Sequence, residues 1–361
     1  MERLIIHYDD KPIYPIIISE SFDDLGNAVA ELNISDRKIC IVTDSNVGPL
    51  YAEQIRQILE RSGMAAVCFE FPAGEENKNL DTVQDLYEFL IEHHFERNDV
   101  LAALGGGVVG DLTGYVAATY LRGIRFIQIP TSLLAQVDSS IGGKTGVDFR
   151  AYKNMVGAFH QPSLVYSNSA SLQTLTERQY VSGLGEIIKH GLIYDSAYYD
   201  WLIDNTDEIS GRSPSVLTAM ILRSDEIKQK VVEDDPTEMG ERAVLNFGHT
   251  FGHAVEKLMN FSMLHGECVS IGMAAAAWLS MSMQMISTQE YHGIISALEV
   301  YDLPVKAPGI KAADIVQITK SDKKMDRGHV KFILLKGIGN AVIETGITDQ
   351  QLLQAAQSIT E

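Results

Sequence analysis

Three histidines in the second half of the chain have the spacing of metal ligands. In the string NFGHTFGH (246–253), His249 and His253 lie one helical turn apart on the same face, and His265 follows 12 residues later. Divalent ions such as zinc accept imidazole nitrogens and carboxylate oxygens, and a catalytic site has three protein ligands. Thr250 excludes the HExxH motif, because it replaces the general-base glutamate. The cluster therefore predicts a metal site, with buried structural histidines as the alternative.

Three glutamates could complete this metal site. They are Glu186, Glu256 and Glu267. Glu186 lies in the string GLGEIIKHG (183–191), and Lys189 follows it one turn later on the same helical face. A plain surface pair of Glu186 and Lys189 is the alternative interpretation. Spacing alone does not choose among the three carboxylates.

A glycine-rich string in the first half has the pattern of a nucleotide site. Leu104 leads into GGGVVGD (105–111), a G-x-G-x-x-G between an apolar strand pattern and an apolar helical pattern. Glycines let backbone amides approach a pyrophosphate, and the helix N-terminus favours its charge. The usual fingerprint follows an earlier strand and has an acid about 20 residues later. Here the acid could be Asp44, which ends IVTD, or Glu75 in AGEENK (73–78); a structural glycine turn is the alternative.

A second polar string suits an anionic ligand. Pro130-Thr131-Ser132 and the later VDSSIGGKTG (137–146) offer many hydroxyl and backbone N–H donors around Lys144. The GGKT letters suggest a Walker A loop. That interpretation fails, because Val137 and Asp138 occupy the place of the required glycine.

The elements that must position these residues differ between the two halves. From residue 38 onward, short β-branched runs alternate with amphipathic helical patterns, which predicts a parallel sheet wrapped by helices. We expect helices at 50–62 and 80–92, and strands at 38–43, 65–70, 99–104, 125–129 and 163–166. The first half is thus predicted to be a Rossmann-like α/β domain.

Beyond about Leu175 the apolar residues recur at three and four instead of two, which is typical of helices. A hairpin of 331–335 and 341–345 is also expected, around Gly337 and Gly339. The predicted helices are 178–193, 215–233, 250–259, 266–285 and 289–298. We therefore predict two domains, residues 1–175 and a mainly helical domain of residues 176–361.

Composition excludes several classes of function. The 361 residues contain 29 Lys and Arg against 48 Asp and Glu, a formal net charge of −19, so nucleic acid and anionic membranes are not expected partners. Three widely spaced cysteines indicate neither a disulfide framework nor a cysteine zinc site. The N-terminus lacks the apolar stretch of a secretory signal, and the longest apolar run, 269–285, is short and polar for a membrane span. We expect a cytoplasmic, soluble protein.

Taken together, six strings in order resemble the 3-dehydroquinate synthase family of sugar phosphate cyclases. They are GGGVVGDLTGYVAATYLRGI (105–124), IPTSLLAQVDSSIGGKTGVD (129–148), KNMVGAFHQP (153–162), GLGEIIKHG (183–191), RAVLNFGHTFGHAVE (242–256) and LHGE (264–267). The resemblance implies a Rossmann-like domain followed by a helical domain, bound NAD and one divalent ion, zinc or cobalt. It also implies a small-molecule sugar phosphate substrate and a homodimer.

The resemblance also implies roles for individual residues. The metal ligands would be Glu186, His249 and His265, with His253 an active-site group near the substrate. Asp138 would orient the substrate or a lysine. Anion binding would fall to Arg122, Lys144, Lys153, Lys189, Arg242, Asn246 and Lys336. The NAD site would be lined by Asp44, Glu75, Lys78, Gly107, Val108, Val109, Gly110, Asp111, Thr131, Ser132, Lys144, Lys153 and Thr174.

The reaction implied is conversion of 3-deoxy-D-arabino-heptulosonate 7-phosphate to 3-dehydroquinate and phosphate, in the shikimate route to aromatic amino acids. A ring hydroxyl is oxidised by NAD, phosphate is eliminated, the hydride returns, the ring opens and an intramolecular aldol closes the carbocycle. A transient ketone acidifies the neighbouring C–H and so permits loss of phosphate. The alternatives are a sister cyclase, such as 2-deoxy-scyllo-inosose synthase, and a metal-dependent alcohol or polyol dehydrogenase.

Overall fold

The computed structural model describes residues 1–150, 152–236, 240–321, 325–326 and 329–360. The chain divides into two compact units. Unit 1 comprises Met1–Leu175 and Leu217–Glu233, and unit 2 comprises Thr176–Val216 and Asp234–Glu361. Unit 1 thus includes residues 217–233, which the sequence prediction had placed in the second domain.

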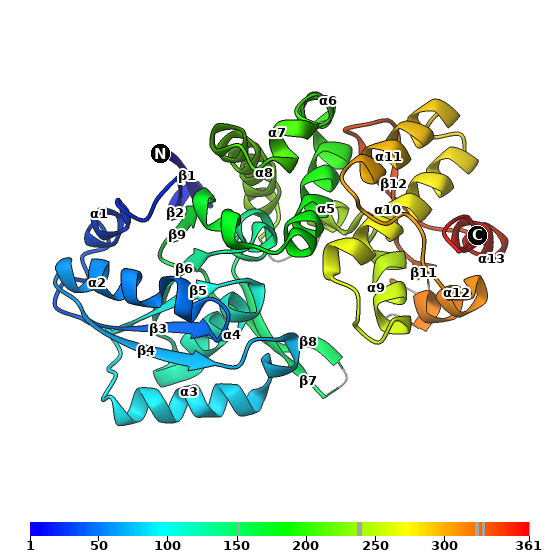
Figure 1. Ribbon diagram of the computed structural model, residues 1–361. Helices are drawn as coiled ribbons and strands as arrows, with labels where there is room; N and C mark the ends of the chain where they lie inside the picture. Colours follow the sequence, from blue (N-terminus) through cyan, green and yellow to red (C-terminus); the bar gives the residue numbers. More distant parts are fainter. Residues whose placement is uncertain (151, 237–239, 322–324, 327–328, 361) are drawn as a thin grey trace. The chain divides into compact units, whose positions relative to one another are not determined.

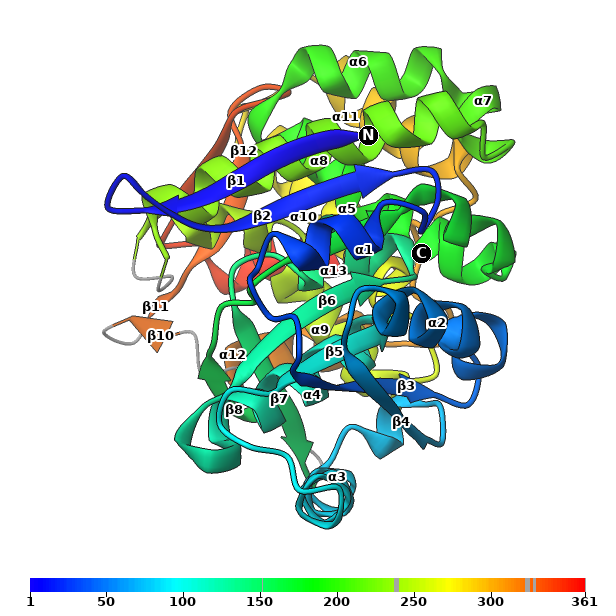
Figure 2. The same cartoon turned by 90° about the vertical axis from the view of Figure 1, so that its left-hand side faces the viewer.

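Unit 1 is built on a seven-stranded sheet with the order β1-β2-β9-β6-β5-β3-β4 (Figures 1 and 2). The antiparallel pair at one edge, β1 and β2, was not predicted; the other neighbours are parallel. The strands are β1 (Glu2–Tyr8), β2 (Lys11–Ser19), β3 (Lys38–Asp44), β4 (Ala65–Phe71), β5 (Val100–Gly105), β6 (Arg125–Pro130) and β9 (Val165–Asn168). The predicted parallel sheet is therefore confirmed.

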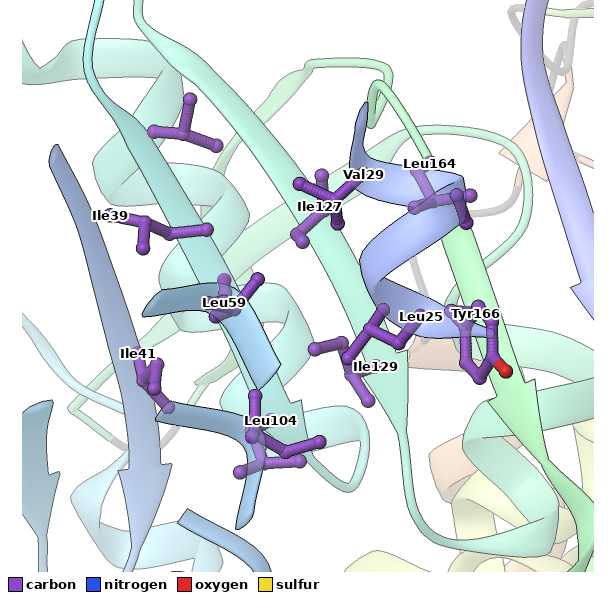
Figure 3. Packing of buried hydrophobic residues seen from close by; sticks show 14 of the residues in the cluster. Leu25, Val29, Ile39, Ile41, Leu59, Leu104, Ile127, Ile129, Leu164 and Tyr166 are labelled. Atoms are coloured by element: carbon purple, nitrogen blue, oxygen red, sulfur yellow. The ribbon is translucent and has the colours of Figure 1, made fainter. Parts of the chain in front are cut away.

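Helices cover both faces of this sheet because its central strands alternate apolar side chains between two cores. Ile39 and Ile41 of β3 face one core, together with α1 (Leu25–Ala30) and α2 (Glu53–Arg61). Figure 3 shows this packing, with Leu25 and Val29 of α1 and Leu59 of α2 beside side chains of the sheet. Cys40 and Val42 face the other core, together with α3 (Leu80–Glu92) and α4 (Gly107–Thr119).

Unit 1 has two further parts. The antiparallel hairpin of β7 (Lys144–Phe149) and β8 (Tyr152–Phe159) was not predicted. The side chains of β8 are half-buried or exposed, and β7 has only a short buried run, Thr145–Val147, so little apolar periodicity marks the hairpin. The helix α8 (Pro214–Asp234) joins unit 1 over residues 217–233, where the Glu233 carboxylate accepts a hydrogen bond from the His7 backbone N–H at 2.7 Å.

Unit 2 is mainly helical, as predicted. Long helices α5 (Glu177–Tyr194), α9 (His249–Leu258) and α10 (His265–Ser282) pack together (Figure 1), and α11 spans Thr288–Val300. The hairpin of β12 (Phe332–Leu335) and β13 (Ala341–Glu344) confirms the late hairpin. The other elements of unit 2 are α6 (Ser196–Asp204), α7 (Thr206–Ser210), a 3₁₀ turn (Glu241–Asn246), α12 (Ala312–Ser321), β10 (Met325–Asp326), β11 (His329–Val330) and α13 (Asp349–Ser358). Within the described residues, no helix has the length and apolar character needed to cross a membrane.

Candidate active site

The strand order of unit 1 marks a ligand position at the carboxyl ends of β3 and β5. From β3 the chain moves to β4 on one side, and then to β5 and β6 on the other, so the order reverses between β3 and β5. Ligands of open α/β sheets bind at such a switch point. The predicted residue Asp44 ends β3, and the glycine string follows β5. The topology thus brings two separately predicted motifs to one edge.

The N-terminus of α4 provides a backbone cradle at this edge. The helix begins at Gly107, and its N-cap, Gly106, makes no side-chain capping bond, so the first N–H groups are available to an anion. A Cβ on Gly106 would lie 3.3 Å from Ser132 Oγ, and one on Gly107 would lie 3.0 Å from Ser139 Oγ. A Cβ at either position would therefore crowd these hydroxyl groups, and the open backbone cradle fits a nucleotide pyrophosphate.

Lys78 is buried beside α4 and bonds two polar side chains that are less buried. Its Nζ donates to Asp111 Oδ2 and to Asn154 Oδ1, each at 2.6 Å, although only 4% of the residue is exposed. Burial opposes its charge, but Asp111, Glu75 and Asp148 outweigh burial and raise the pKa of Lys78. The ammonium therefore stays charged next to the helix N-terminus. Asn154 was not among the residues expected from the sequence.

Other residues expected at the nucleotide site lie in the loops of unit 1. The Thr131 N–H donates to Gly105 O at 2.9 Å, and Ser132 Oγ accepts from the Ala135 N–H. Thr174 Oγ1 lies 2.7 Å from the Tyr51 hydroxyl, and Asp44 Oδ1 accepts from the Asn46 N–H. Lys144 begins β7 and is exposed, and Lys153 Nζ lies 3.8 Å from Glu75 Oε1.

Asp138 is held by a lysine that sequence reasoning missed. Lys228 Nζ donates to Asp138 Oδ1 at 2.5 Å and also to its backbone carbonyl, and only 5% of Lys228 is exposed. The signal was present in the sequence, because Lys228 falls in the apolar register of α8, seven residues after Ile221 and three before Val231. A charged residue on a buried helical face requires a partner.

Unit 2 brings the three metal ligands that the resemblance implies into one group. One ligand atom from each of Glu186, His249 and His265 lies within 4.8 Å of the others. Glu186 Oε1 is 3.7 Å from His249 Nε2 and 3.4 Å from His265 Nε2. The three residues come from α5, α9 and α10, so residues up to 79 positions apart in sequence converge.

Glycines at the helix crossings set this geometry. A Cβ on Gly266 would lie 1.8 Å from the Ser182 carbonyl oxygen, and one on Gly185 would lie 2.9 Å from the Gly266 carbonyl oxygen. The backbones of α5 and α10 therefore touch at residues directly adjacent to Glu186 and His265. Likewise, a Cβ on Gly272 of α10 would lie 1.8 Å from the Gly248 carbonyl oxygen, just before α9.

The protonation states of the group suit a cation. Burial opposes ionisation of Glu186, but Lys189 and the two imidazoles outweigh burial and hold the pKa of its carboxyl well below the usual value. Burial, with Lys189, holds the pKa of His249 well below its usual value, so the imidazole is neutral. His249 Nδ1 donates to Phe247 O at 3.2 Å, which leaves a lone pair on Nε2, facing Glu186.

An unsatisfied atom supports the fit to a metal ion. Lys189 Nζ bonds Glu186 Oε2, whereas Glu186 Oε1 is buried without a hydrogen-bond partner among the described residues. The pair is fully buried, which excludes a surface Glu186–Lys189 pair. A second group, His253, Glu256 and His265, shares one histidine with the first. Glu267 is instead engaged with Arg178. One carboxylate oxygen between two imidazoles is a donor set for zinc or cobalt.

The remaining predicted substrate-binding residues lie in both units. His253 lies next to the triad, its ring centroid 5.3 Å from that of His249. Asn246 ends the 3₁₀ turn before α9, and the buried Arg242 in that turn donates to Pro236 O. Lys336 follows β12 and is exposed. Arg122 is exposed in unit 1, in the turn after α4, with a φ of 67°.

Comparisons with known proteins agree over both units. Residues 68–182 match the family of 3-dehydroquinate synthase N-terminal domains, and residues 183–325 match the family of its C-terminal domains. The chain is 43% identical over 354 residues to 3-dehydroquinate synthase of Acetivibrio thermocellus, which covers 98% of each protein.

Two solved structures have the same fold. One is 2-epi-5-epi-valiolone synthase from Streptomyces hygroscopicus subsp. jinggangensis 5008 with NAD+ and Zn2+ bound; it is 27% identical, with a TM-score of 0.88 and 96% coverage of both chains. The other is 2-deoxy-scyllo-inosose synthase complexed with carbaglucose-6-phosphate, NAD+ and Co2+. It is 24% identical, with a TM-score of 0.88, and covers 98% of this chain and 99% of that one.

Proposed function

This chain belongs to the 3-dehydroquinate synthase family, and we propose that it performs that family's reaction with the residue roles set out below. The enzyme is a lyase that converts 3-deoxy-D-arabino-heptulosonate 7-phosphate to 3-dehydroquinate and phosphate. It uses NAD and a divalent metal. NAD supplies a recycled hydride acceptor for one ring hydroxyl, so no net reduction accompanies turnover.

We assign NAD binding to residues 1–175 and metal binding to residues 176–361, and the proposed substrate-binding residues come from both ranges. The N–H groups at the start of α4, from Gly107 onward, would hold the pyrophosphate, and Lys78 would contribute a fixed positive charge beside them. The other NAD-binding residues in this proposal are Asp44, Glu75, Val108, Val109, Gly110, Asp111, Thr131, Ser132, Lys144, Lys153 and Thr174.

In unit 2 we propose Glu186, His249 and His265 as the metal ligands. A bound divalent ion would supply positive charge that polarises a substrate oxygen. Lys189 neutralises the second oxygen of Glu186, and the Phe247 carbonyl fixes the His249 ring so that Nε2 faces the site. His253 stands beside the ligands and would contact substrate.

The substrate carries a carboxylate and a phosphate, so its binding requires fixed donors. We propose Arg122, Lys144, Arg242, Asn246 and Lys336 for these anions, since guanidinium groups bind them in a planar fork. Asp138 would orient the substrate, and Lys228, buried against it, would hold the Asp138 carboxylate in place.

The buried group of Glu186, His249 and His265 carries this proposal, and phosphate release tests it. The purified, metal-loaded protein is mixed with the heptulosonate phosphate and catalytic NAD, and phosphate, dehydroquinate and NADH absorbance are followed. We expect phosphate and dehydroquinate in equal amounts, with no accumulation of NADH. NADH accumulation with a simple polyol would indicate a dehydrogenase instead. Phosphate release only from a hexose 6-phosphate would indicate a sister cyclase.

We further propose a homodimer located in the cytoplasm. The homodimer rests on the family resemblance, and the location rests on the three widely spaced cysteines, which favour a reducing compartment. The oligomeric state can be measured directly by light scattering of the purified protein. With a net charge of −19, neither nucleic acid nor an anionic membrane is expected as a partner.

A further inference from the structure

A bidentate ion pair connects α5, the helix that carries Glu186, to α10, the helix that carries His265. Arg178 Nε donates to Glu267 Oε1 at 2.6 Å, and a terminal guanidinium nitrogen donates to Oε2 at 2.8 Å. That nitrogen also donates to the Ser262 carbonyl oxygen at 3.1 Å. Glu267 Oε2 accepts from the Leu264 N–H at 2.7 Å. We refer to Arg178 and Glu267 as the clamp.

The clamp lies next to a proposed metal ligand without touching it. Glu267 is the third residue of α10, and His265 is the first. Arg178 is in the first turn of α5, two turns before Glu186. The clamp therefore ties the segment that leads into His265, from Ser262 to Leu264, to the helix that carries Glu186.

The first turn of α10 needs such support. The first N–H groups of a helix have no partner inside it, and helix ends fray. Here the N-cap is Leu264, whose side chain has no atom that could accept from the first N–H groups of the helix. The Gly266 N–H donates instead to Ser182 Oγ of α5 at 3.1 Å, and the Leu264 N–H donates to the Glu267 carboxylate. An exposed ion pair contributes little to stability, but this pair is bidentate and the Glu267 side chain is only 12% exposed.

The position of His265 matters because its Nε2 must stay near Glu186 Oε1, at 3.4 Å in this structure. Groups that orient metal ligands change metal affinity about 10- to 100-fold when they are removed. We propose that Arg178 and Glu267 are positioning residues that fix the start of α10 and thereby raise the affinity of the site for its divalent ion. The inference rests on the proposed assignment of His265 as a ligand.

The test measures metal affinity and spectrum, apart from activity. The metal-free full chain is titrated with Zn2+ in competition with a chromophoric chelator, and with Co2+ while the visible absorption spectrum is recorded. The variants are Arg178→Gln, Glu267→Gln, the double variant and Glu186→Gln. We expect each clamp variant to bind Zn2+ about 10- to 100-fold more weakly and to shift the Co2+ bands. The Zn2+ affinity of the double variant should equal that of the single variant that binds Zn2+ more weakly, because both residues act through one contact.

A matched control distinguishes the clamp from a general loss of charge on α5. Glu177 is the neighbour of Arg178 in the same turn, and it pairs with Arg212 at 2.7 Å. Its side chain is 70% exposed. Glu177→Gln should therefore leave Zn2+ affinity and the Co2+ spectrum unchanged.

The outcomes separate the inference from the proposed function. If Glu186→Gln loses metal while Arg178→Gln keeps the affinity and spectrum of the unmodified protein, the clamp is overturned and the metal site stands. If Glu186→Gln binds metal as tightly as the unmodified protein, the metal site itself is wrong. Arg178 is 57% exposed, so Arg178→Gln should fold even if Glu267→Gln does not. With saturating Zn2+, kcat of Arg178→Gln should recover, whereas Glu186→Gln should stay inactive.

Discussion

At the scale of single residues, burial decides which of several similar side chains form the site. Glu186, Glu256 and Glu267 are equivalent by sequence spacing, but only Glu186 is fully buried with an unpartnered oxygen between two imidazoles. A buried charge is retained only where other charges compensate it. The surroundings of Glu186, with Lys189 on one oxygen, leave the other oxygen for a cation.

The two histidines of the HTFGH string should differ in what they lose on substitution. We expect His249→Ala to lose bound metal, because its Nε2 faces Glu186 Oε1. His253→Ala should retain metal and lose turnover. Metal content by atomic absorption and phosphate release by colorimetry, measured on the same samples, check this. Equal loss of metal from both variants would contradict the ligand assignment.

Asp225 should make stability depend on pH. It is fully buried in α8, and neither carboxylate oxygen has a hydrogen-bond partner among the described residues. Burial raises the pKa of Asp225 well above its usual value, although Lys228 opposes this. The folded protein therefore binds this proton more tightly than the unfolded chain does. The free energy of unfolding should fall as pH rises from about 4 towards the raised pKa.

The Asp225→Asn variant should not show this fall in the free energy of unfolding with rising pH, because the amide does not ionise. The melting temperature of the variant should match that of the unmodified protein near pH 4 and exceed it increasingly towards pH 7, by about 2–4 °C for each kcal/mol. Calorimetry over this pH range measures the difference. Asp85→Asn, at an exposed position of α3, is the control and should show no such trend. A constant difference at all pH values would mean that Asp225 does not titrate as expected.

The spacing of residues in the sequence indicated the ligand types but could not choose the ligands, which only the family resemblance did. The spacing predicted His249 and His265 together, because they are close in the chain. It could not select Glu186, because that residue is 63 positions from His249 and joins it only through helix packing. The place of Lys228 in the apolar register of α8 marked it as a buried lysine, but its partner, Asp138, is 90 positions away and could not be identified from the sequence.

At the scale of elements, the close crossing of α5 and α10 predicts that a side chain at Gly266 will not be tolerated. Gly266→Ala should destabilise the protein by more than about 3 kcal/mol and abolish metal binding, because the added Cβ would lie 1.8 Å from the Ser182 carbonyl oxygen. Gly293→Ala, in α11, meets nothing within 4 Å and should be stabilising by about 0.5–1 kcal/mol. Urea unfolding and metal titration measure both. A normally stable Gly266→Ala would disprove the close crossing.

Elements with clear periodicity were predicted closely, and short or half-exposed ones were missed. The predicted 80–92 helix coincides with α3, and the strands at 38–43 and 65–70 fall within β3 and β4. The buried residues of α3 (Thr82, Val83, Leu86 and Leu90) recur at helical spacing, and β3 is a continuous buried run. The hairpin of β7 and β8 contains glycines at 146 and 157 where the backbones approach closely, so it reads as a loop. The five-residue α7 is too short to show any period.

At the scale of the whole molecule, the net charge describes the surface and not the ligands. A charge of −19 argues against nucleic acid as a partner, yet both proposed organic ligands are anions. Their recognition must therefore depend on local basic groups, such as Lys78 in unit 1 and Lys189 in unit 2, both buried.

The division into units predicts that metal and NAD bind separately. All three proposed metal ligands belong to unit 2, and the residues proposed for NAD belong to unit 1. Removing metal with a chelator should abolish turnover but leave the NAD dissociation constant unchanged, as measured by calorimetric titration. Restoring Zn2+ should restore activity. Loss of NAD binding on chelation would show that the assignment of the two ligands to separate units is incomplete.

Because residues 217–233 belong to unit 1, the protein cannot be divided into its two units by a single cut in the chain. Neither unit is a continuous stretch, and the chain passes from one to the other three times. A fragment ending at residue 175 would lack α8, and with it the partner of Asp138 and the buried side chains of Leu217, Met220 and Ile221. Expression of either half by simple truncation should therefore give aggregates. A folded unit 1 would instead require a redesigned chain that joins residue 175 to residue 217 through a short linker.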